Sequence, residues 1–234
     1  MCPMTQERSA VEKFGTAVGD RLYYRLRDDV LFARLAPGQR LTLERMKEEY
    51  CASIGTLREV LNRLASEGLV AAEGARGFAV APASVSNLRE IASIRLLLEC
   101  HALRESFKLG DIDWEGRVVA THHKLATYEK KMSAGDRSEA EAWKRHDAAF
   151  HDALISACGS DLLLEMHRAI YDKYLRYLVL ADVYRGQVAV NEHRKLLQLA
   201  LARDWRAAQR ILMKHVQDCV AYIVDKGLAV DRIQ

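Results

Sequence analysis

The stretch SIGTLREVLNRLASEG, residues 53–68, decides how the first part of the chain folds. Its apolar residues recur at the three- and four-residue spacing of one helix face. They are Ile54, Leu57, Leu61 and Leu64. Ser53 is a residue type that caps the start of a helix, and Gly68 is one that stops it. We therefore expect a helix that starts at Ser53, ends near Glu67 and keeps its polar face in solvent.

Two helical patterns precede this stretch. Residues 16–35 carry apolar side chains at helical spacing, and Pro37-Gly38 then breaks the chain. Residues 43–50 form a second, shorter helical pattern. Cys51 and Ala52 leave room for only a tight turn before the next helix. Two helices joined by such a turn are the helix-turn-helix arrangement.

Two short strand patterns follow the stretch. Residues 69–70 and 78–80 are apolar, and the glycine-containing residues 73–77 between them indicate a turn. A hairpin after three helices completes the plan of a winged helix-turn-helix. We predict this domain over residues 16–83, after a flexible tail over residues 1–15.

From Ser84 onward the sequence has only helical patterns. The predicted helices lie near residues 86–109, 113–133, 137–157, 160–182, 187–202 and 204–227. The whole chain has 3 prolines and 13 glycines in 234 residues, which favours a helical protein with few long loops. The predicted fold class is mainly α, with an N-terminal winged helix-turn-helix followed by an all-α helical bundle over residues 84–234.

Composition limits the classes of partner. The formal net charge is +3, so any contact with DNA must come from local placement of basic residues and not from bulk attraction. The first 15 residues contain no apolar signal segment, and no run approaches the roughly 18 apolar residues of a membrane span. We expect no membrane partner and a cytoplasmic location.

The helix predicted first has a start that suits DNA binding. Free N–H groups at a helix N-terminus attract a phosphate, and the hydroxyls of Ser53 and Thr56 can add contacts. Arg58 and Arg63 can bond phosphates or read a guanine edge. Arg76, at the tip of the predicted hairpin, can enter a minor groove or touch the DNA backbone. Each arginine alone could equally be a solvated side chain, so the prediction rests on the ordered set.

Three histidines of the helical part lie on otherwise apolar helix faces: His151, His193 and His215. A buried imidazole needs a partner or loses roughly 1–3 kcal/mol. Asp147 is four residues before His151, so both side chains point to one spot from one helix. The Asp-His-His-His set suits a divalent metal, and Zn²⁺, Ni²⁺, Mn²⁺ and Fe²⁺ all accept these ligand types. The alternative is that each histidine is a hydrogen-bonded core residue.

Arg95 also lies on an apolar helix face and therefore needs an anion. Glu99, four residues later, can supply one within the protein. A carboxylate of a bound ligand can supply it instead. Tyr177 and Asn191 are further candidates for effector binding, although tyrosines at helical spacing are more often core residues.

The N-terminal residues resemble the GntR family of bacterial regulators. The resemblance is carried by LAPGQRL at residues 35–41, SIGTLREVLNRLASEGLV at residues 53–70 and GARGFAVAP at residues 74–82. It implies that Arg58 matches a DNA-contacting arginine and that Arg45 lies one position from another. The usual Ser-Arg-Thr-Pro start of the family's reading helix is Ser-Ile-Gly-Thr here. An arginine that typically reads guanine is therefore absent, and the operator sequence cannot be transferred.

The helical part resembles the FCD ligand-binding domain of the FadR-type subgroup. The matching positions are Arg95, Glu99, Asp147, Phe150, His151, Ala157 to Ser160, Glu192, His193, Arg194, Met213 and His215. Residues 143–160, together with residues 53–61, are similar to the carbon-starvation-induced, glutarate-responsive branch. The Asp-His-His-His set matches the metal-binding pattern of this domain.

Together these resemblances imply a ligand-responsive transcription regulator, by default a repressor, that controls the metabolism of a small organic acid. A small carboxylate effector would bind between the metal and Arg95. A homodimer would read a pseudo-palindromic operator in double-stranded DNA. The runner-up hypothesis is a metal-dependent enzyme built on the Asp-His-His-His centre, although the sequence offers no HExxH pair or second carboxylate as a general base.

Overall fold

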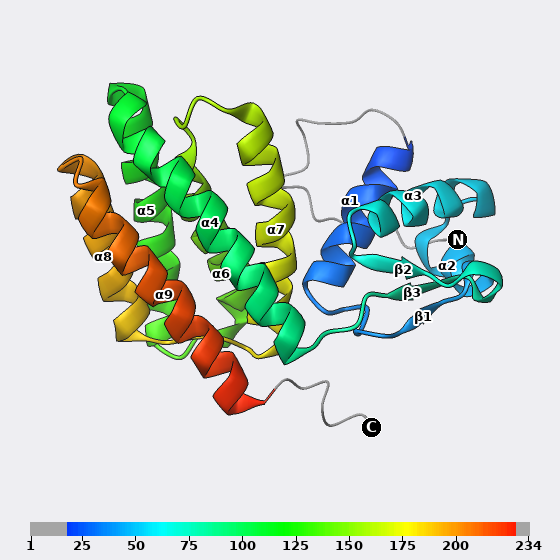
Figure 1. Ribbon diagram of the computed structural model, residues 1–234. Coiled ribbons are helices and arrows are strands. Elements are labelled where there is room, and N and C mark those ends of the chain that lie inside the picture. The colour runs from blue at the N-terminus through cyan, green and yellow to red at the C-terminus, as the bar shows by residue number, and fades with distance from the viewer. Residues whose placement is uncertain (1–17, 228–234) are drawn as a thin grey trace. The chain divides into compact units, whose positions relative to one another are not determined.

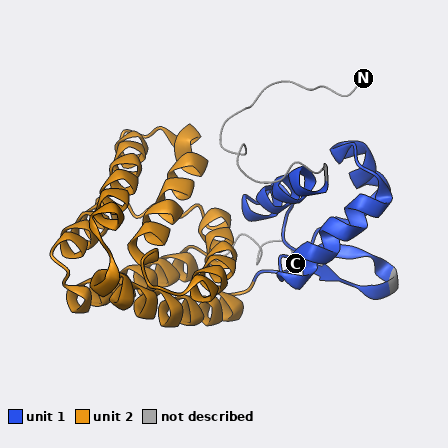
Figure 2. Cartoon of the chain, turned by 90° about the horizontal axis from the view of Figure 1, so that it is seen from above, with its two compact units in different colours: residues 1–83 blue, residues 84–234 orange. Residues whose placement is uncertain are grey.

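The computed structural model describes residues 18–227, so the tail predicted over residues 1–15 lies outside the described residues. The chain divides into two compact units, residues 1–83 and 84–234 (Figure 2). We call them the N-terminal unit and the helical unit. Figure 1 labels the elements of both.

The N-terminal unit combines three helices with a small sheet. In chain order its elements are α1 (Val18–Leu31), β1 (Arg40–Leu41), α2 (Leu43–Tyr50), α3 (Ile54–Ser66), β2 (Val70–Ala72), the 3-10 turn η1 (Gly74–Arg76) and β3 (Phe78–Val80). The strand order is β1-β3-β2, and both neighbouring pairs are antiparallel. The sequence patterns missed β1, because a two-residue strand has no periodicity to detect.

Helix α3 forms as its sequence predicts. The Ser53 hydroxyl accepts a hydrogen bond from the Thr56 backbone N–H at 3.1 Å, which caps the helix. The tight turn before it depends on Cys51, whose φ of 51° lies in the left-handed region. The side chains that pack inward are fully buried: Leu57, Leu61 and Leu64. Ile54 is only half-buried, and Val60, which the predicted stripe omitted, lies in the core instead.

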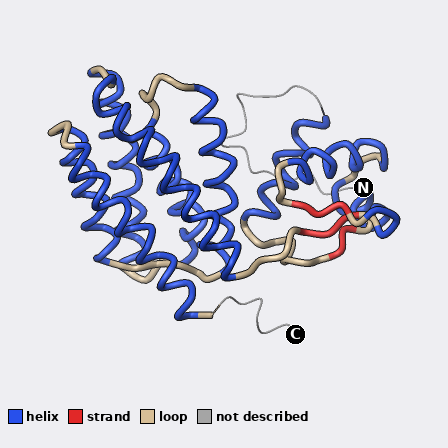
Figure 3. The backbone as a smooth tube through the Cα atoms, viewed as in Figure 1, coloured by secondary structure: helices blue, strands red, loops and turns tan. Residues whose placement is uncertain are grey.

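The helical unit has only helices among its described regular elements (Figure 3). They are α4 (Val85–Leu109), α5 (Ile112–Ser133), the 3-10 turn η2 (Arg137–Glu139), α6 (Ala140–Ile155), α7 (Asp161–Leu180), α8 (Gln187–Leu201) and α9 (Trp205–Lys226). Helix α4 packs against α6, α7 and α9, while α8 packs against α5 and α9. The predicted fold class, a winged helix-turn-helix followed by an all-α bundle, is confirmed. The helix expected from residue 137 starts at Ala140, after η2.

Candidate functional site

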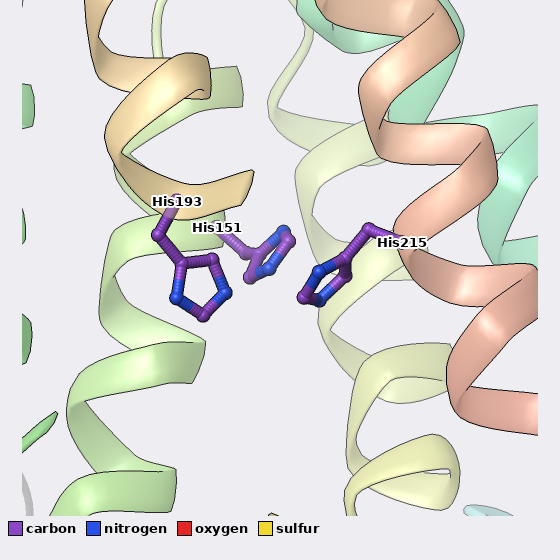
Figure 4. Close-up of side chains that lie close together, drawn as sticks. All are labelled: His151, His193 and His215. Carbon is purple, nitrogen blue, oxygen red and sulfur yellow. The ribbon is translucent and has the colours of Figure 1, made fainter. Parts of the chain in front are cut away.

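Three histidines meet inside the helical unit. His151 comes from α6, His193 from α8 and His215 from α9, and their rings converge on one point (Figure 4). One nitrogen from each ring lies within 4.8 Å of the others. All three side chains are buried. The sequence predicted this convergence because each histidine is on an apolar helix face.

A carboxylate holds the outer nitrogen of each ring. His151 Nδ1 lies 2.6 Å from Glu99 Oε1, and His193 Nδ1 lies 2.7 Å from Glu129 Oε1. His215 Nδ1 lies 2.8 Å from Glu192 Oε2. A proton on Nδ1 that is donated to a carboxylate leaves the Nε2 lone pair free for a metal, and this arrangement surrounds most metal-bound histidines. The sequence did not indicate that Glu129 and Glu192 are hydrogen-bond partners of His193 and His215, because contacts between different helices leave no local sequence pattern.

The inner nitrogens are unsatisfied. Nε2 of His151 and Nε2 of His193 are buried and have no hydrogen-bond partner among the described residues. His193 Nε2 lies 3.2 Å from Asp147 Oδ1, without the alignment of a hydrogen bond. Two ligand-type atoms aimed at the same small space, both unpartnered, fit a cation between them.

Asp147 completes the group. Its Oδ2 accepts a hydrogen bond from the Tyr171 hydroxyl at 3.0 Å, which leaves Oδ1 directed at His193. Burial raises the pKa of Asp147, but the neighbouring imidazoles, His193 first, lower it well below its usual range. The carboxylate is therefore ionised. Of the four predicted metal ligands, the three histidines form one cluster and Asp147 adjoins it through His193.

The electrostatics of the group also favour a cation. Burial lowers the pKa of His193, but the carboxylates of Asp147 and Glu129 outweigh burial and raise it to about 9. Burial lowers the pKa of His215 to about 3, against the opposing effect of Glu192. A positive charge is thus stabilised at one place, between Asp147 and Glu129.

A charge count over the groups that contact the three imidazoles gives the same result. They are the carboxylates of Glu99, Glu129, Asp147 and Glu192 and the guanidinium groups of Arg95 and Arg185. Four negative and two positive charges leave a net charge of −2 before any imidazole proton is counted; the raised pKa of His193 places one proton there, and a metal that displaces this proton meets the full −2. One divalent cation would balance this charge.

Arg95 is almost completely buried beside the histidines. Its Nε donates to Glu99 Oε2 at 2.6 Å, and its Nη2 lies 3.2 Å from His151 Nδ1. Its guanidinium lies 4.5 Å from the ring centres of both Tyr171 and Tyr174. The internal carboxylate that the sequence offered as one partner, Glu99, is therefore in place.

A pocket adjoins the histidines. Its polar lining consists of Arg95, Asp147, Arg185, His193 and His215, and its other walls are mostly apolar. The enclosed part of this pocket is about 20 Å³, close to the space that one water molecule needs, and it opens toward solvent. Such a mixture of apolar walls and a few convergent polar groups is typical of small-molecule sites. Arg185 comes from the loop between α7 and α8, so no helical periodicity in the sequence marks it as a pocket residue.

Two residues expected at the effector site lie elsewhere. The Tyr177 hydroxyl donates to Asn87 Oδ1 at 2.8 Å and accepts from the Ser84 backbone N–H at 3.2 Å. Asn191 is exposed and accepts from Gln187 at 2.9 Å. Neither side chain lines the pocket.

Three of the residues predicted to bind DNA, Ser53, Thr56 and Arg58, lie at the start of α3. Ser53 and Thr56 lie at its first turn, with their hydroxyl oxygens 2.9 Å apart. Arg58 is exposed and makes no side-chain hydrogen bond or ion pair with the described residues. Arg76, at the end of η1, is also exposed.

The other two arginines have partners within the N-terminal unit. Arg63 lies 3.5 Å from Asp20 and 3.6 Å from Glu67, and its guanidinium lies 3.6 Å from the centre of the Tyr23 ring. Arg45 pairs with Glu49 at 3.6 Å on the exposed face of α2. Arg63 therefore joins α3 to α1. Of the two arginines on α3, Arg58 has fewer contacts within the protein.

Family comparisons match both units. Residues 19–80 match the description "Bacterial regulatory proteins, gntR family", and residues 90–218 match "FCD domain". Among the described residues no helix is both long and apolar enough to cross a membrane.

Relatives cover nearly the whole chain. It is 34% identical to the HTH-type transcriptional regulator BphR of Paraburkholderia xenovorans (strain LB400), over 97% of this chain and 90% of the relative. It is 29% identical to the HTH-type transcriptional repressor GlaR of Escherichia coli (strain K12), over 83% of this chain and 90% of the relative. A GntR regulator structure from Rhodococcus sp. RHA1 shares the fold, with a TM-score of 0.73 at 22% identity, over 88% of this chain and 97% of that one. The families and relatives are regulators, so the enzyme hypothesis is not retained.

Proposed function

Since the chain belongs to the gntR family of bacterial regulatory proteins and carries an FCD domain, which makes it a DNA-binding transcription regulator, we propose that it is a repressor controlled by a small carboxylate. The carboxylate binds in the pocket of the helical unit, next to a divalent metal. The relative GlaR, itself named a repressor, supports the proposed direction of control.

The metal is proposed from the unsatisfied nitrogens. Asp147, His151, His193 and His215 would hold it, and Glu99, Glu129 and Glu192 would orient the three rings. Two buried, unpartnered Nε2 atoms, of which that of His193 lies 3.2 Å from Asp147 Oδ1, are the observation that carries this step. When bound, such an ion supplies a positive centre to which carboxylate oxygens coordinate.

The effector is proposed from the lining of the pocket. The cationic groups of Arg95 and Arg185 lie beside the histidines, and most of the remaining walls are apolar. A small organic acid complements this lining. The similarity of residues 143–160 and 53–61 to the glutarate-responsive branch favours a dicarboxylate such as glutarate.

DNA binding is assigned to the start of α3 and the hairpin. Ser53, Thr56 and Arg58 would contact one major groove, with Arg76 beside it on the wing, and Arg45 and Arg63 would contact phosphates. One such unit reads few base pairs, so we propose a homodimer on a pseudo-palindrome. Effector binding would shift the population between two dimer geometries, only one of which fits both half-sites.

A thermal-shift screen of the metal-stripped full-length protein tests this function. We expect Zn²⁺, Ni²⁺, Mn²⁺ or Fe²⁺ to raise the melting temperature, and one or more small carboxylates to raise it further only when metal is present. The Asp147→Ala variant should lose both effects. A broad panel of metals and acids that leaves the melting temperature of the wild type unchanged would refute the sensing function.

A further inference from the structure

Arg185 is a nearly buried cation at the pocket that pairs with Glu192 and Asp218 but keeps one donor without an acceptor. It lies in the loop between α7 and α8, and its side chain is only 7% exposed. Its Nε is buried and has no hydrogen-bond partner among the described residues. A buried donor without an acceptor is costly, so an additional acceptor at this place would be stabilising.

The loop that carries Arg185 is held firmly. Lys144 Nζ, buried on α6, donates to the backbone carbonyls of Leu178 and Val183 at 3.0 Å each. The Tyr184 hydroxyl lies 2.7 Å from the Ser133 hydroxyl on α5. Because the loop is fixed from two neighbouring helices, Arg185 is oriented toward the pocket before any ligand arrives. Preorganisation of this kind reduces the entropy lost on binding.

The Arg185 guanidinium and Glu192 compete for one ring nitrogen. Nη2 of Arg185 contacts the Glu192 carboxylate and lies 2.9 Å from His215 Nδ1. The same Nδ1 lies 2.8 Å from Glu192 Oε2. A ring nitrogen either donates a proton or accepts one, so His215 Nδ1 cannot donate to Glu192 and accept from Arg185 at the same time.

Metal binding would decide this competition. A metal on His215 Nε2 requires the ring proton to be on Nδ1, from which it can only be donated to Glu192. The Arg185 N–H that faces Nδ1 then loses its acceptor. Together with the unpartnered Nε, it leaves two donors of one planar group available in a nearly closed site. A carboxylate matches such a pair of donors.

We propose that Arg185 binds a carboxylate oxygen of the effector and becomes available to do so only when metal occupies the histidines. This inference rests on the proposed function and adds a residue and an order of binding to it. Metal and acid are then linked through the His215 ring: the metal fixes the proton on Nδ1, and the fixed proton releases Arg185. By reciprocity, the acid strengthens metal binding by the same factor.

Calorimetric titrations of the full-length protein test the assignment. The probes are Zn²⁺ alone, then acetate, succinate and glutarate, each added with and without Zn²⁺. The variants are Arg185→Gln, Arg185→Lys and, as a matched control, Arg168→Gln, which removes an exposed arginine paired with Asp152 on the outside of the unit.

For the wild type we expect at least one acid to bind about tenfold tighter with zinc than without it. Arg185→Gln should weaken that binding about 10- to 100-fold, the usual loss of a hydrogen bond to a charged group. Its zinc affinity should stay equal or rise, because a positive charge and a competing donor to His215 are removed. Arg185→Lys should retain part of the acid affinity, and Arg168→Gln should behave as the wild type.

Each other result overturns the assignment. Unchanged acid binding in Arg185→Gln refutes the role of Arg185 while the proposed function stands. A parallel loss of zinc and acid binding in that variant would show that Arg185 only supports the fold of the loop. A wild type that binds zinc but none of the three acids, or no zinc, contradicts the proposed function as well.

Discussion

The two units of this protein place their charged residues in opposite ways. All eleven buried polar or charged residues among those described belong to the helical unit, and the buried core of the N-terminal unit is hydrophobic. The arginines at the start of α3 and on the wing are exposed, whereas Arg95 is 1% exposed. The proposed DNA contacts therefore lie on a surface, whereas the proposed metal and effector sites lie in an interior.

This difference has consequences for stability. An apolar core stabilises a unit whatever its ligands are. Buried charges are stable only while each keeps its partner, so the interior of the helical unit depends on pairing and on what occupies its centre. The predictions below test whether the units respond as differently as their interiors suggest.

The largest effect is expected from breaking the buried Arg95–Glu99 pair. Glu99→Ala leaves an unpaired guanidinium in the core and should lower the free energy of unfolding by about 3–5 kcal/mol. Urea denaturation of the full-length protein measures this loss. The double variant Arg95→Met/Glu99→Leu removes both charges and should recover most of it. A single-variant loss below about 1 kcal/mol would mean that the pair is not confined in a dry interior.

A comparable loss is expected in the apolar core of the other unit. Leu61 is fully buried in α3. Its replacement by alanine should lower the free energy of unfolding by about 2–5 kcal/mol. Asn62→Ala, on the exposed face of the same helix, is the control and should change stability little. Addition of Zn²⁺ should not restore the stability of Leu61→Ala in this unit. Restoration by the metal would contradict the separation between the two kinds of interior.

A smaller effect, on metal affinity, is expected from changing a carboxylate that orients a histidine ligand without binding the metal itself. Glu129→Gln keeps a hydrogen-bond acceptor beside His193 but removes its charge. It should weaken metal binding about 10- to 100-fold, as measured by competition with a metal-chelating dye. Glu139→Gln, which removes a partly exposed carboxylate paired with Lys131, is the control. Equal metal affinity in both variants would show that the charge on Glu129 does not tune the site.

The smallest changes in stability, with a clear change in function, are expected at the surface of α3. Arg58→Ala should weaken operator binding by about 1–3 kcal/mol and leave the melting temperature unchanged, because Arg58 makes no ion pair or side-chain hydrogen bond with the described residues. Arg63→Ala loses a ring contact and two ion pairs, so it should lower stability by up to about 1 kcal/mol. Fluorescence anisotropy with labelled DNA and thermal melting distinguish the two. If Arg58→Ala destabilised the protein and bound DNA normally, the surface role would be wrong.

Sequence patterns predicted the parts of the molecule that repeat locally. Helix α2 occupies the predicted residues 43–50, and α3 ends one residue before the predicted position. Asp147 and His151 could be paired because their spacing places both on one helix turn. Strand β1 was not predicted because two residues are too few to show a periodicity. Val60 was not predicted to be buried because the face of α3 that packs inward is wider than the predicted apolar stripe.

The partners of the site residues were harder to predict. Glu129 and Glu192 reach His193 and His215 from other helices, and Arg185 reaches His215 from a loop. Such contacts depend on how helices pack and not on local spacing. The sequence shows that Glu192 precedes His193, but it does not show that the Glu192 carboxylate contacts the ring of His215.

The most direct test of the account is operator affinity measured under four conditions. DNA selected from a random library by the full-length protein is titrated with metal-stripped or zinc-loaded protein, each with and without the acid found by thermal shift. We predict that the acid weakens DNA binding only when zinc is present, and that Asp147→Ala binds DNA but ignores the acid. Operator affinity that is the same in all four conditions would contradict the claim that the buried histidine centre controls the exposed helix.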